Sequence, residues 1–511
     1  MLDNKIQIII RRLNFVVKLP NAMHKNVIEH MMVRLSTFSF KYDHKRKRNI
    51  RVPDKLYAVE NNRTLTYRFN INLLKNFMLL LGNNFITKDQ LDISFDKDCN
   101  PSELGLDFIS KYTPREYQEE YYEALVKEPA PYMLVDLMMG LGKTYISMLT
   151  ATRINQKMFI LVLPKYINKW IGDVKTLTNV ADDEIYVIKG ADSLNNLIAL
   201  NQEGSCKHKF IIAGIRTMYN YIKDYENAVY EEEFTYLTTP DILMSTLGVG
   251  IVLNDETHQE FHAVFKLGLY FDSCRFIGLS ATLENLDKSV NDKYDIMFPN
   301  KCRISGLVEF VPYVETYNVR YAIYGNAKIK HQRQQGYSHN LFEESFMRNS
   351  MFLKDYVEML THYCNVGYIQ HRTEGDKLLI FVASIKFATL LTQHLSIVYD
   401  YLDVKRYVED DPYENIMDSD ICVSTVQSSG TALDIPDLIT VIQTVSMRSL
   451  QANKQSFGRL RNLKGKVTRF YSIYSKSIPK QVMSAGIRKQ ILKKLSNNWY
   501  EEEYSKEIRS R

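Results

Sequence analysis

The chain has 511 residues, of which 45% are hydrophobic and 24% are charged, and its formal net charge is +6. This length excludes a single core and predicts about three domains, and no apolar stretch is long enough to span a membrane. The mild positive charge permits a nucleic-acid partner, although a basic enzyme without such a partner would have the same balance.

The cysteines are scattered, without a C-x-x-C pair or paired histidines nearby. We therefore expect reduced, buried thiols and no metal site built from them. We expect no secretory signal at the N-terminus, because the apolar run from Ile6 to Ile10 ends at two arginines. We expect a cytoplasmic protein, in the host cytoplasm if a phage encodes it. The cysteines are Cys99, Cys206, Cys274, Cys302, Cys364 and Cys422.

The first hundred residues predict a small α+β domain. Apolar residues favour strands from Ile6 to Lys18, and helical periodicity covers His24 to Leu35. A basic run with aromatic neighbours follows from Lys41 to Arg51. Such a run is either a solvated loop or a phosphate contact. Its candidate DNA-binding residues are Lys45, Arg46, Lys47 and Arg48.

Two strand-like segments, around 56–59 and 65–69, and a helix from Leu73 to Leu81 complete this domain. The polar residues from Asp89 to Glu103 predict a linker. We place the small basic accessory domain at residues 1–104.

The rest of the chain alternates strand-like and helical segments. Short β-branched and aromatic runs separated by helices predict parallel sheets with helices on both faces. We expect two α/β domains, at residues 105–310 and 311–511, with an extended hinge segment from Val311 to Arg333 and a helical tail after Ser475. The runs cover residues 158–163, 210–215, 250–253 and 276–279, and then 378–382, 421–426, 438–444 and 467–473.

A phosphate loop is predicted where the apolar run from Tyr132 leads into Met138-Met139-Gly140-Leu141-Gly142-Lys143-Thr144. The N–H groups of such a turn and the N-terminus of the following helix bind phosphates. Lys143 would reach the β- and γ-phosphates, and Thr144 would hold Mg²⁺. Leu137 replaces the first glycine of the usual G-x-x-x-x-G-K-[ST] pattern, so a chance Gly-Lys-Thr is the alternative for this motif alone.

An acidic pair, Asp255 and Glu256, directly follows the apolar run from Ile251. The carboxyl end of such a parallel strand lies beside the phosphate loop. We expect Asp255 to hold magnesium and Glu256 to orient the attacking water. The alternative is a polar cap after a core strand.

Two further motifs follow in order. Ser280-Ala281-Thr282 ends another strand-like run, and a segment from Gln455 to Arg461 lies in the second α/β domain. An arginine supplied across a cleft neutralises charge that develops on the transferred phosphoryl group, and we assign this role to Arg459.

The motifs from Thr113 to Arg461 resemble, in type and order, those of superfamily 2 helicases and translocases. The resemblance implies an α/β fold of two tandem RecA-like domains, here preceded by the small α+β domain, and ATP with Mg²⁺ as cofactors. Asn462 stands where the family usually has a second arginine, and Arg461 is the candidate substitute. The implied catalytic residues are Lys143, Asp255, Glu256, Gln455, Arg459 and Arg461. The implied nucleotide contacts are Arg115, Gln118, Gly140, Leu141, Gly142, Lys143, Thr144, Gly430 and Asp434, with Thr144 and Asp255 toward the metal.

The resemblance also implies a backbone-tracking groove for nucleic acid. Contacts to the backbone fix register without reading sequence, so movement along the strand should be independent of sequence. The segment from Ile160 to Lys165, with Trp170, is similar to its counterpart in Snf2-type translocases, and the domain order is similar to that of phage UvsW-type branch-migration helicases. The implied DNA contacts are Lys165, Thr217, Thr282 and Thr425, and the coupling residues are Ser280, Thr282 and His258.

Three hypotheses for the function stay open. The first is an ATP-dependent helicase that unwinds or branch-migrates forked, junction or single-stranded DNA in recombination, replication or repair. The second is a Snf2-like duplex translocase that does not separate strands, and the third is a binding protein with a degenerate ATPase scaffold. Intact Lys143, Asp255 and Arg459 argue against the third. We expect a monomer, with recombination or replication proteins as possible partners.

Overall fold

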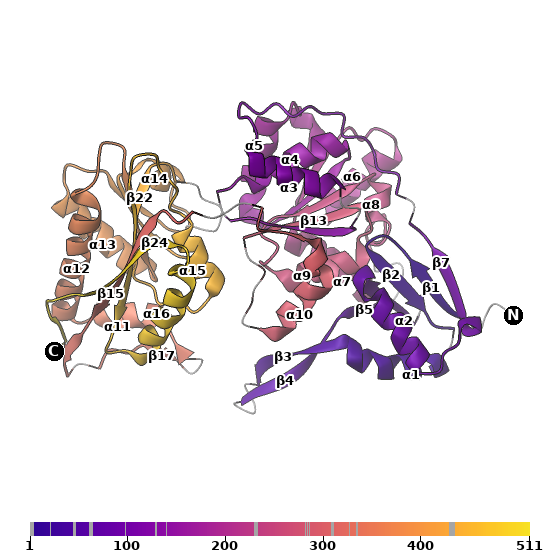
Figure 1. Cartoon of the computed structure of the whole chain (residues 1–511), viewed down its shortest axis with the longest axis horizontal. Coiled ribbons are helices and arrows are strands. Elements are labelled where there is room, and N and C mark those ends of the chain that lie inside the picture. Colours follow the sequence, from indigo (N-terminus) through magenta and orange to yellow (C-terminus); the bar gives the residue numbers. More distant parts are fainter. Residues whose placement is uncertain are drawn as a thin grey trace. The chain divides into compact units, whose positions relative to one another are not determined.

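The computed structural model divides the chain into two compact units, Met1–Val308 and Glu309–Arg511 (Figure 1). Each unit is described by itself. The residues that the structure describes are 5–20, 22–43, 48–60, 65–97, 99–127, 130–138, 140–228, 234–281, 283, 285, 287–307, 311–326, 328–333, 336–428 and 435–510.

The first unit begins with a five-stranded sheet in the order β5-β6-β2-β1-β7. The predicted strands and both predicted helices are confirmed, but the expected linker from Asp89 to Glu103 is wrong in part, because β7 pairs in parallel with β1. The residues Leu91-Asp92-Ile93-Ser94-Phe95 alternate apolar and polar side chains, which is a strand pattern. The elements are β1 (Ile6–Ile10), β2 (Asn14–Lys18), α1 (Ala22–Met32), β5 (Tyr57–Glu60), β6 (Thr66–Asn70), α2 (Leu74–Asn83) and β7 (Leu91–Phe95).

A two-stranded antiparallel arm, β3 (Ser36–Asp43) with β4 (Arg48–Lys55), projects from this sheet (Figure 1). The basic run, for which we expected either a solvated loop or a phosphate contact, therefore lies mostly on two paired strands. Residues Lys45 to Lys47 and the side chain of Arg48 lie outside what the structure describes, so their DNA-binding role stays a prediction. The guanidinium of Arg51 lies over the Phe38 ring at 3.5 Å from its centroid, which stabilises the pairing of the arm.

The second part of the first unit is a seven-stranded sheet in the order β10-β11-β9-β12-β13-β8-β14, with every described neighbour parallel. The predicted strands are confirmed, and the helices cover both faces, with α4 and α5 on one and α9 and α10 on the other (Figure 1). The strands are β8 (Tyr132–Asp136), β9 (Met158–Val162), β10 (Ile185–Ile188), β11 (Phe210–Gly214), β12 (Ile251–Asn254), β13 (Arg275–Ser280) and β14 (Arg303–Ile304). The helices are α3 (Glu116–Lys127), α4 (Lys143–Ile154), α5 (Ile167–Leu177), α6 (Ala191–Gln202), α7 (Ile215–Asn227), α8 (Leu243–Thr246), α9 (Phe261–Tyr270) and α10 (Lys288–Met297).

The small sheet and the seven-stranded sheet share one hydrophobic core, in which Phe15 and Phe69 belong to the same cluster as Phe276. A buried ion pair reinforces the junction, since Arg68 lies 2.9 Å from Glu60 and 3.2 Å from Asp241. The arm is attached as well, because the buried Lys293 of α10 forms an ion pair with Asp54 at 2.8 Å. The accessory domain is therefore built into the first unit.

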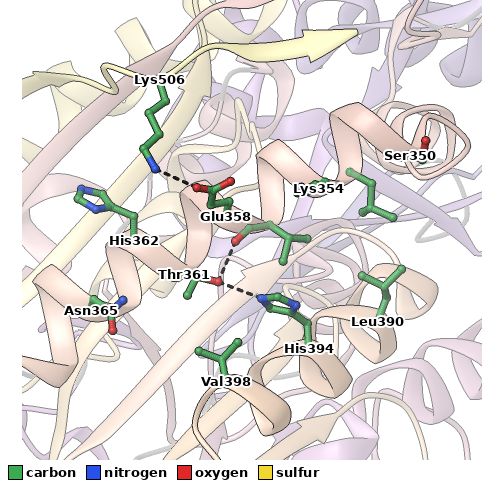
Figure 2. A pocket seen from close by; sticks show the side chains of 12 residues that line it. Ser350, Lys354, Glu358, Thr361, His362, Asn365, Leu390, His394, Val398 and Lys506 are labelled. Atoms are coloured by element: carbon green, nitrogen blue, oxygen red, sulfur yellow. Dashed lines mark hydrogen bonds and ion pairs between the residues drawn. The ribbon is translucent and has the colours of Figure 1, made fainter. Parts of the chain in front are cut away.

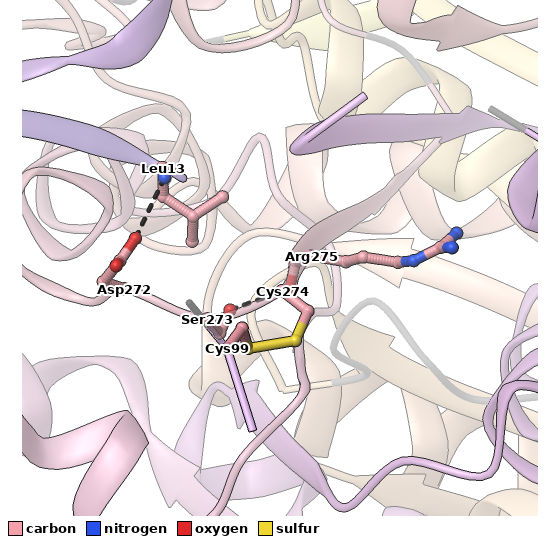
Figure 3. Close-up of a disulfide and its surroundings, with 6 residues drawn as sticks. All are labelled: Leu13, Cys99, Asp272, Ser273, Cys274 and Arg275. Carbon is pink, nitrogen blue, oxygen red and sulfur yellow. Dashed lines mark hydrogen bonds between the residues drawn. A yellow bond between two sulfur atoms is a disulfide. The ribbon is translucent and has the colours of Figure 1, made fainter. Parts of the chain in front are cut away.

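One disulfide contradicts our expectation that all thiols are reduced. Cys99, in the segment after β7, is bonded to Cys274, which directly precedes β13 (Figure 3). The two residues are 175 positions apart, so their spacing gave no sign of the pairing. Three of the free cysteines are buried, as predicted, and Cys206 is partly exposed.

The second unit is built on another seven-stranded sheet, in the order β20-β21-β19-β22-β23-β15-β24, again with parallel neighbours. Helices α12 and α13 cover one face, and α15 and α16 cover the other (Figure 1). The strands are β15 (Val314–Tyr321), β19 (Lys377–Val382), β20 (Val404–Tyr407), β21 (Ile421–Thr425), β22 (Leu438–Gln443), β23 (Thr468–Ser475) and β24 (Ser496–Glu503). The helices are α11 (His339–Phe346), α12 (Ser350–Cys364), α13 (Ile385–Val398), α14 (Glu414–Asp418), α15 (Leu450–Phe457) and α16 (Pro479–Leu492).

Two sequence predictions for the second unit are wrong in part. The expected hinge segment from Val311 to Arg333 contains β15, an inner strand of the sheet. The expected helical tail contains α16 but then returns as the edge strand β24. Three glutamates end β24, a composition that disfavours strands in general, and ion pairs such as Arg320 with Glu503 at 2.8 Å compensate here. Short strands β16 (Ile323–Gly325) and β25 (Ile508–Ser510) pair beside the sheet, and β17 (Gln332–Arg333) and β18 (Gly336–Tyr337) form a small hairpin.

Candidate nucleotide-binding site

The predicted phosphate loop connects β8 to α4 and depends on two glycines with left-handed backbone angles. Gly140 has φ of 80° and Gly142 has φ of 87°, a region that residues with a Cβ rarely adopt. A Cβ on Gly142 would also lie 2.3 Å from Nε2 of Gln118. The turn that directs the backbone toward a phosphate therefore requires glycine here.

The start of α3 is tied to this loop. Gln118 donates from Nε2 to the Leu141 carbonyl at 3.2 Å, and Tyr117 donates its hydroxyl to the same oxygen at 3.0 Å. The backbone N–H of Arg115 donates to Oε1 of Gln118 at 3.0 Å, and the Arg115 side chain is exposed. Arg115 and Gln118 thus lie beside the loop, and their role as nucleotide contacts stays a prediction. Tyr117 is an additional neighbour that the motif did not indicate.

Lys143 and Thr144 open α4, and both are half-buried. The Lys143 ammonium donates to the Leu137 carbonyl at 3.0 Å. Leu137 itself is a core residue, 1% exposed, and its N–H donates to the Ser280 carbonyl at 3.0 Å. The residue that replaces the usual first glycine is therefore used for packing, with its carbonyl facing the lysine.

The acidic pair follows β12 and is buried, with Asp255 7% exposed and Glu256 5% exposed. Asp255 accepts two hydrogen bonds, from Nε1 of Trp170 at 2.8 Å and from the Glu256 N–H at 2.9 Å. Glu256 has φ of 48°, which is uncommon outside glycine and occurs often at functional sites. The geometry holds both carboxylates at the end of the strand.

His258 and Ser280 link this strand end to the next one. His258 Nδ1 lies 3.0 Å from Ser280 Oγ and 3.4 Å from a Glu256 carboxylate oxygen. Burial and the nearby Lys143 ammonium lower the pKa of His258 to about 3, so its imidazole is neutral at physiological pH. Thr282, the third predicted coupling residue, lies outside the described residues.

These motifs meet because β13 lies between β8 and β12 in the sheet. Backbone bonds join the strand ends, from Leu137 N–H to the Ser280 carbonyl and from Thr257 N–H to the Leu279 carbonyl at 2.9 Å. Carboxyl ends of parallel strands share one edge of a sheet, which is where ligands bind in open α/β folds.

The donor set fits a nucleotide with Mg²⁺. The glycine turn and helix N-terminus present N–H groups to phosphate, and a threonine hydroxyl and carboxylate oxygens suit Mg²⁺. Within the described ranges, no group of three or more His, Cys, Asp or Glu side chains could hold a metal ion alone. Mg²⁺ usually keeps waters and binds substrate phosphates through one or two protein ligands, so such a cluster is not needed.

Two predicted DNA contacts of the first unit adjoin each other. Lys165 is exposed on the short helix η5 (Pro164–Tyr166), and Thr217 lies in the first turn of α7. A Cβ placed on Gly214 would lie 3.2 Å from Oγ1 of Thr217 and 3.6 Å from the side chain of Pro164. The two segments therefore meet at the carboxyl ends of β9 and β11, the same sheet edge as the acidic pair.

The second unit carries the remaining candidates. Thr425 ends β21, and its hydroxyl donates to Ser428 Oγ at 2.7 Å. Gln455 is half-buried on α15, Arg459 is 2% exposed, and Arg461 donates to the Gly458 carbonyl of its own loop. Gly430 and Asp434 lie outside the residues that the structure describes.

A cavity of about 690 Å³ in the second unit contains none of the predicted site residues. It lies between α12 and α13, with Leu353 and Leu390 among its apolar lining (Figure 2). Polar contacts cross it, from Thr361 Oγ1 to His394 Nε2 at 3.3 Å and from Lys506 to Glu358 at 2.8 Å.

Comparison with known proteins supports the motif assignment over one part of the chain. The family described as type III restriction enzyme, res subunit, matches residues 111–285. No curated protein sequence is similar enough to match the chain. Within the described ranges, no helix has the length and apolar character needed to cross a membrane.

Three solved structures are similar over large parts of their length. The structure of T4 UvsW covers 99% of this chain and 100% of its own, at 13% identity and a TM-score of 0.35. The Pyrococcus furiosus Hef helicase domain covers 73% and 98%, at 16% identity and a TM-score of 0.43. S. cerevisiae Dbp5 bound to RNA and ADP BeF3 covers 76% and 90%, at 12% identity and a TM-score of 0.48.

These scores are low, and the RecA-like assignment rests on the two parallel sheets of the chain itself. The family match includes the phosphate loop, the acidic pair and Ser280. Residues 111–285 are thus similar to this family over the stretch that holds these motifs, and the predicted resemblance to superfamily 2 helicases is confirmed there.

Proposed function

We propose that the protein is an ATP-driven motor on nucleic acid, a DNA helicase or translocase that remodels forked and junction DNA. The observation that supports this most is the meeting of the phosphate loop, the acidic pair and Ser280 at the ends of β8, β12 and β13. The proposed domains are the accessory domain at 1–104 and the motor domains at 105–310 and 311–511.

Each residue at this edge has a role in the proposal. The turn at Gly140 and Gly142 binds phosphate through its N–H groups, and the Lys143 ammonium neutralises the β- and γ-phosphates. The Glu256 carboxylate orients the attacking water as general base. Thr144 and Asp255 would hold Mg²⁺, which supplies charge neutralisation when bound with ATP.

His258 and Ser280 connect the acidic pair to the strand that ends at the nucleic-acid side. Because His258 is neutral, its ring can accept a hydrogen bond at one nitrogen and donate at the other. We infer that this pair couples hydrolysis to the hold on a strand, together with Thr282.

In this proposal, the second unit supplies further residues that act on the nucleotide. Arg459, with Arg461 and Gln455, would neutralise charge that develops on the transferred phosphoryl group. Gly430 and Asp434 would contact the nucleotide. Closure of the two motor domains on ATP would then be required for hydrolysis, and reopening would move the strand.

The nucleic acid would be held through its backbone by Lys165, Thr217, Thr282 and Thr425. The accessory arm is attached to α10 by the buried pair of Lys293 with Asp54. Through this attachment, Lys45 to Arg48 would grip duplex DNA at a fork while the motor pulls a strand.

The test compares ATP turnover and strand displacement on single-stranded, duplex, forked and four-way DNA, with single-stranded RNA as a further arm. We expect the largest stimulation and displacement on forked or four-way DNA. Stimulation by duplex without displacement would instead identify the Snf2-like translocase. Absence of ATP turnover on every substrate would contradict both motors.

A further inference from the structure

Trp170, on α5, is one of the largest fully buried side chains in the described part of the chain, with no exposed surface. Its Nε1–H donates to Oδ2 of Asp255 at 2.8 Å. A hydrogen bond to a charged acceptor is roughly twice as strong as a neutral one, and a low local dielectric strengthens it further. The indole therefore fixes the orientation of this carboxylate.

The remaining contacts of Asp255 complete the constraint. Its Oδ1 accepts the Glu256 N–H at 2.9 Å, and its own N–H donates to the Leu161 carbonyl of β9 at 3.1 Å. A carboxylate has about four lone-pair sites, so these bonds leave sites for a further ligand. The carboxylate is held in one rotamer by a side chain from another element.

That element begins at the proposed nucleic-acid contact. The short helix η5, which carries exposed Lys165, continues directly into α5 at Ile167. Because η5 and α5 are contiguous helical turns, a shift of η5 under a nucleic-acid backbone would displace the indole donor as well. A continuous path thus runs from Lys165 to the Asp255 carboxylate.

We propose that Trp170 is a positioning residue that couples nucleic-acid contact at η5 to the carboxylate that would hold Mg²⁺. This inference rests on the proposed function, because it assigns Asp255 to the metal and Lys165 to the nucleic acid. The alternative is that Trp170 only packs in the core. In that case its indole would not influence the carboxylate that would hold Mg²⁺.

The chain offers a matched control, since it has two tryptophans. Trp499 on β24 also donates its indole N–H to a carboxylate, Glu501 Oε1 at 2.8 Å, but it is half-buried and belongs to the second unit. Trp170→Phe and Trp499→Phe therefore remove the same kind of bond at two places.

The first experiment measures the Mg²⁺ concentration that gives half-maximal ATP turnover, with and without forked DNA, in the full-length protein. Loss of a partner that orients a metal ligand typically costs 10- to 100-fold in metal affinity or activity. We expect Trp170→Phe to raise the required Mg²⁺ by about 10-fold and to reduce stimulation by DNA, with Trp499→Phe like the wild type. Equal Mg²⁺ requirements in the two variants would overturn the proposal.

The second experiment needs no turnover and no change at Trp170. In Trp499→Phe, Trp170 is the remaining indole, so its fluorescence reports on the surroundings of Asp255. We expect Mg²⁺ with ADP to change the emission saturably, and Asp255→Asn in the same background to abolish the change. A constant emission while ADP binds, measured by calorimetry, would overturn the proposal.

The experiments distinguish a failure of the proposed function from a failure of the proposed role of Trp170. If the wild type does not hydrolyse ATP, the proposed function fails. If it hydrolyses ATP with stimulation by DNA and Trp170→Phe matches Trp499→Phe, only the coupling role fails.

Discussion

The two large sheets have the same parallel architecture but use their carboxyl edges differently. In the first unit, this edge holds a glycine turn, a lysine that opens α4 and a buried acidic pair. In the second unit, the buried charges bind the fold itself. Arg488 donates to Asn453 Oδ1 at 2.9 Å, Ser472 Oγ at 2.6 Å and the Val445 carbonyl at 2.8 Å.

Glu343 in the second unit also serves the fold. Its carboxylate accepts the N–H groups of Ala383 and Ser384 at 2.8 and 2.7 Å, at the turn between β19 and α13. We therefore propose that the first edge is the chemical site, and that the second unit is a rigid support for the few residues, above all Arg459, that act on the nucleotide.

The largest effect is expected at the first edge. Lys143→Ala should abolish ATP turnover, because it removes the main protein charge on the β- and γ-phosphates. Steady-state phosphate release measures this. Lys175→Ala, at an exposed lysine of α5, is the control and should keep wild-type turnover. Turnover that survives in Lys143→Ala would refute the motor assignment.

Arg459→Ala tests the proposed complement in the second unit. We expect kcat to fall by about 10³-fold or more, since an arginine finger contributes 10³ to 10⁵. ATP binding, measured with a fluorescent analogue, should change much less. Arg448→Ala removes an exposed arginine just before α15 and should leave kcat unchanged. If both variants hydrolyse ATP equally, Arg459 belongs to the support and not to the site.

Glu343→Gln tests, through the pH dependence of folding stability, whether the Glu343 carboxyl group serves the fold of the second unit. Burial raises the pKa of Glu343 to about 7, and the hydrogen bonds from Ser384 and Ala383 offset part of this. A carboxyl group whose pKa is raised on folding makes the folded state bind more protons, so it removes stability as pH rises from about 4.5 to 7. Thermal melting of the wild type should show this loss, and Glu343→Gln should lack it.

His339, whose Nε2 lies 3.8 Å from Glu343, contributes the opposite slope, because burial and the nearby Arg488 guanidinium lower its pKa to about 3. Its contribution is lost as pH falls from 6.5 toward 3. The difference between the wild type and Glu343→Gln isolates the carboxyl group. Melting curves with the same pH dependence in both would contradict the assignment, and Glu344→Gln at the neighbouring position is the control.

The smallest effect is expected at the accessory arm. Reversing the charges of Lys45, Arg46, Lys47 and Arg48 should weaken binding to forked DNA and reduce its salt dependence, because each phosphate contact releases counterions. Basal ATP turnover should stay the same. Charge reversal of Lys493 and Lys494 on the second unit is the control. If the salt dependence of DNA binding were unchanged in the arm variant, the basic run would be only a solvated surface.

Local patterns predicted much of this molecule. Apolar runs identified the inner strands β8, β9, β12 and β13, and the polar residues at their ends identified the site, because strand ends in a parallel sheet share an edge. The fold class was therefore predictable. The roles of the site residues stay predictions that the experiments above test.

What the sequence could not predict depends on contacts between distant residues. The bond from Trp170 to Asp255 joins residues 85 positions apart, and the disulfide joins residues 175 apart. Strand β24 is too charged to predict alone and forms because β15 offers an edge and cations pair with its glutamates. Strand β7 was missed because its polar flanks obscured a five-residue alternation.

The most direct test of the central claim is ATP turnover by the full-length protein as forked DNA is added. The account predicts that turnover rises saturably with DNA in the wild type and that Lys143→Ala and Arg459→Ala each remove the DNA-stimulated rate. Turnover that does not respond to any nucleic acid, or that persists in Arg459→Ala, would contradict a motor built from both units.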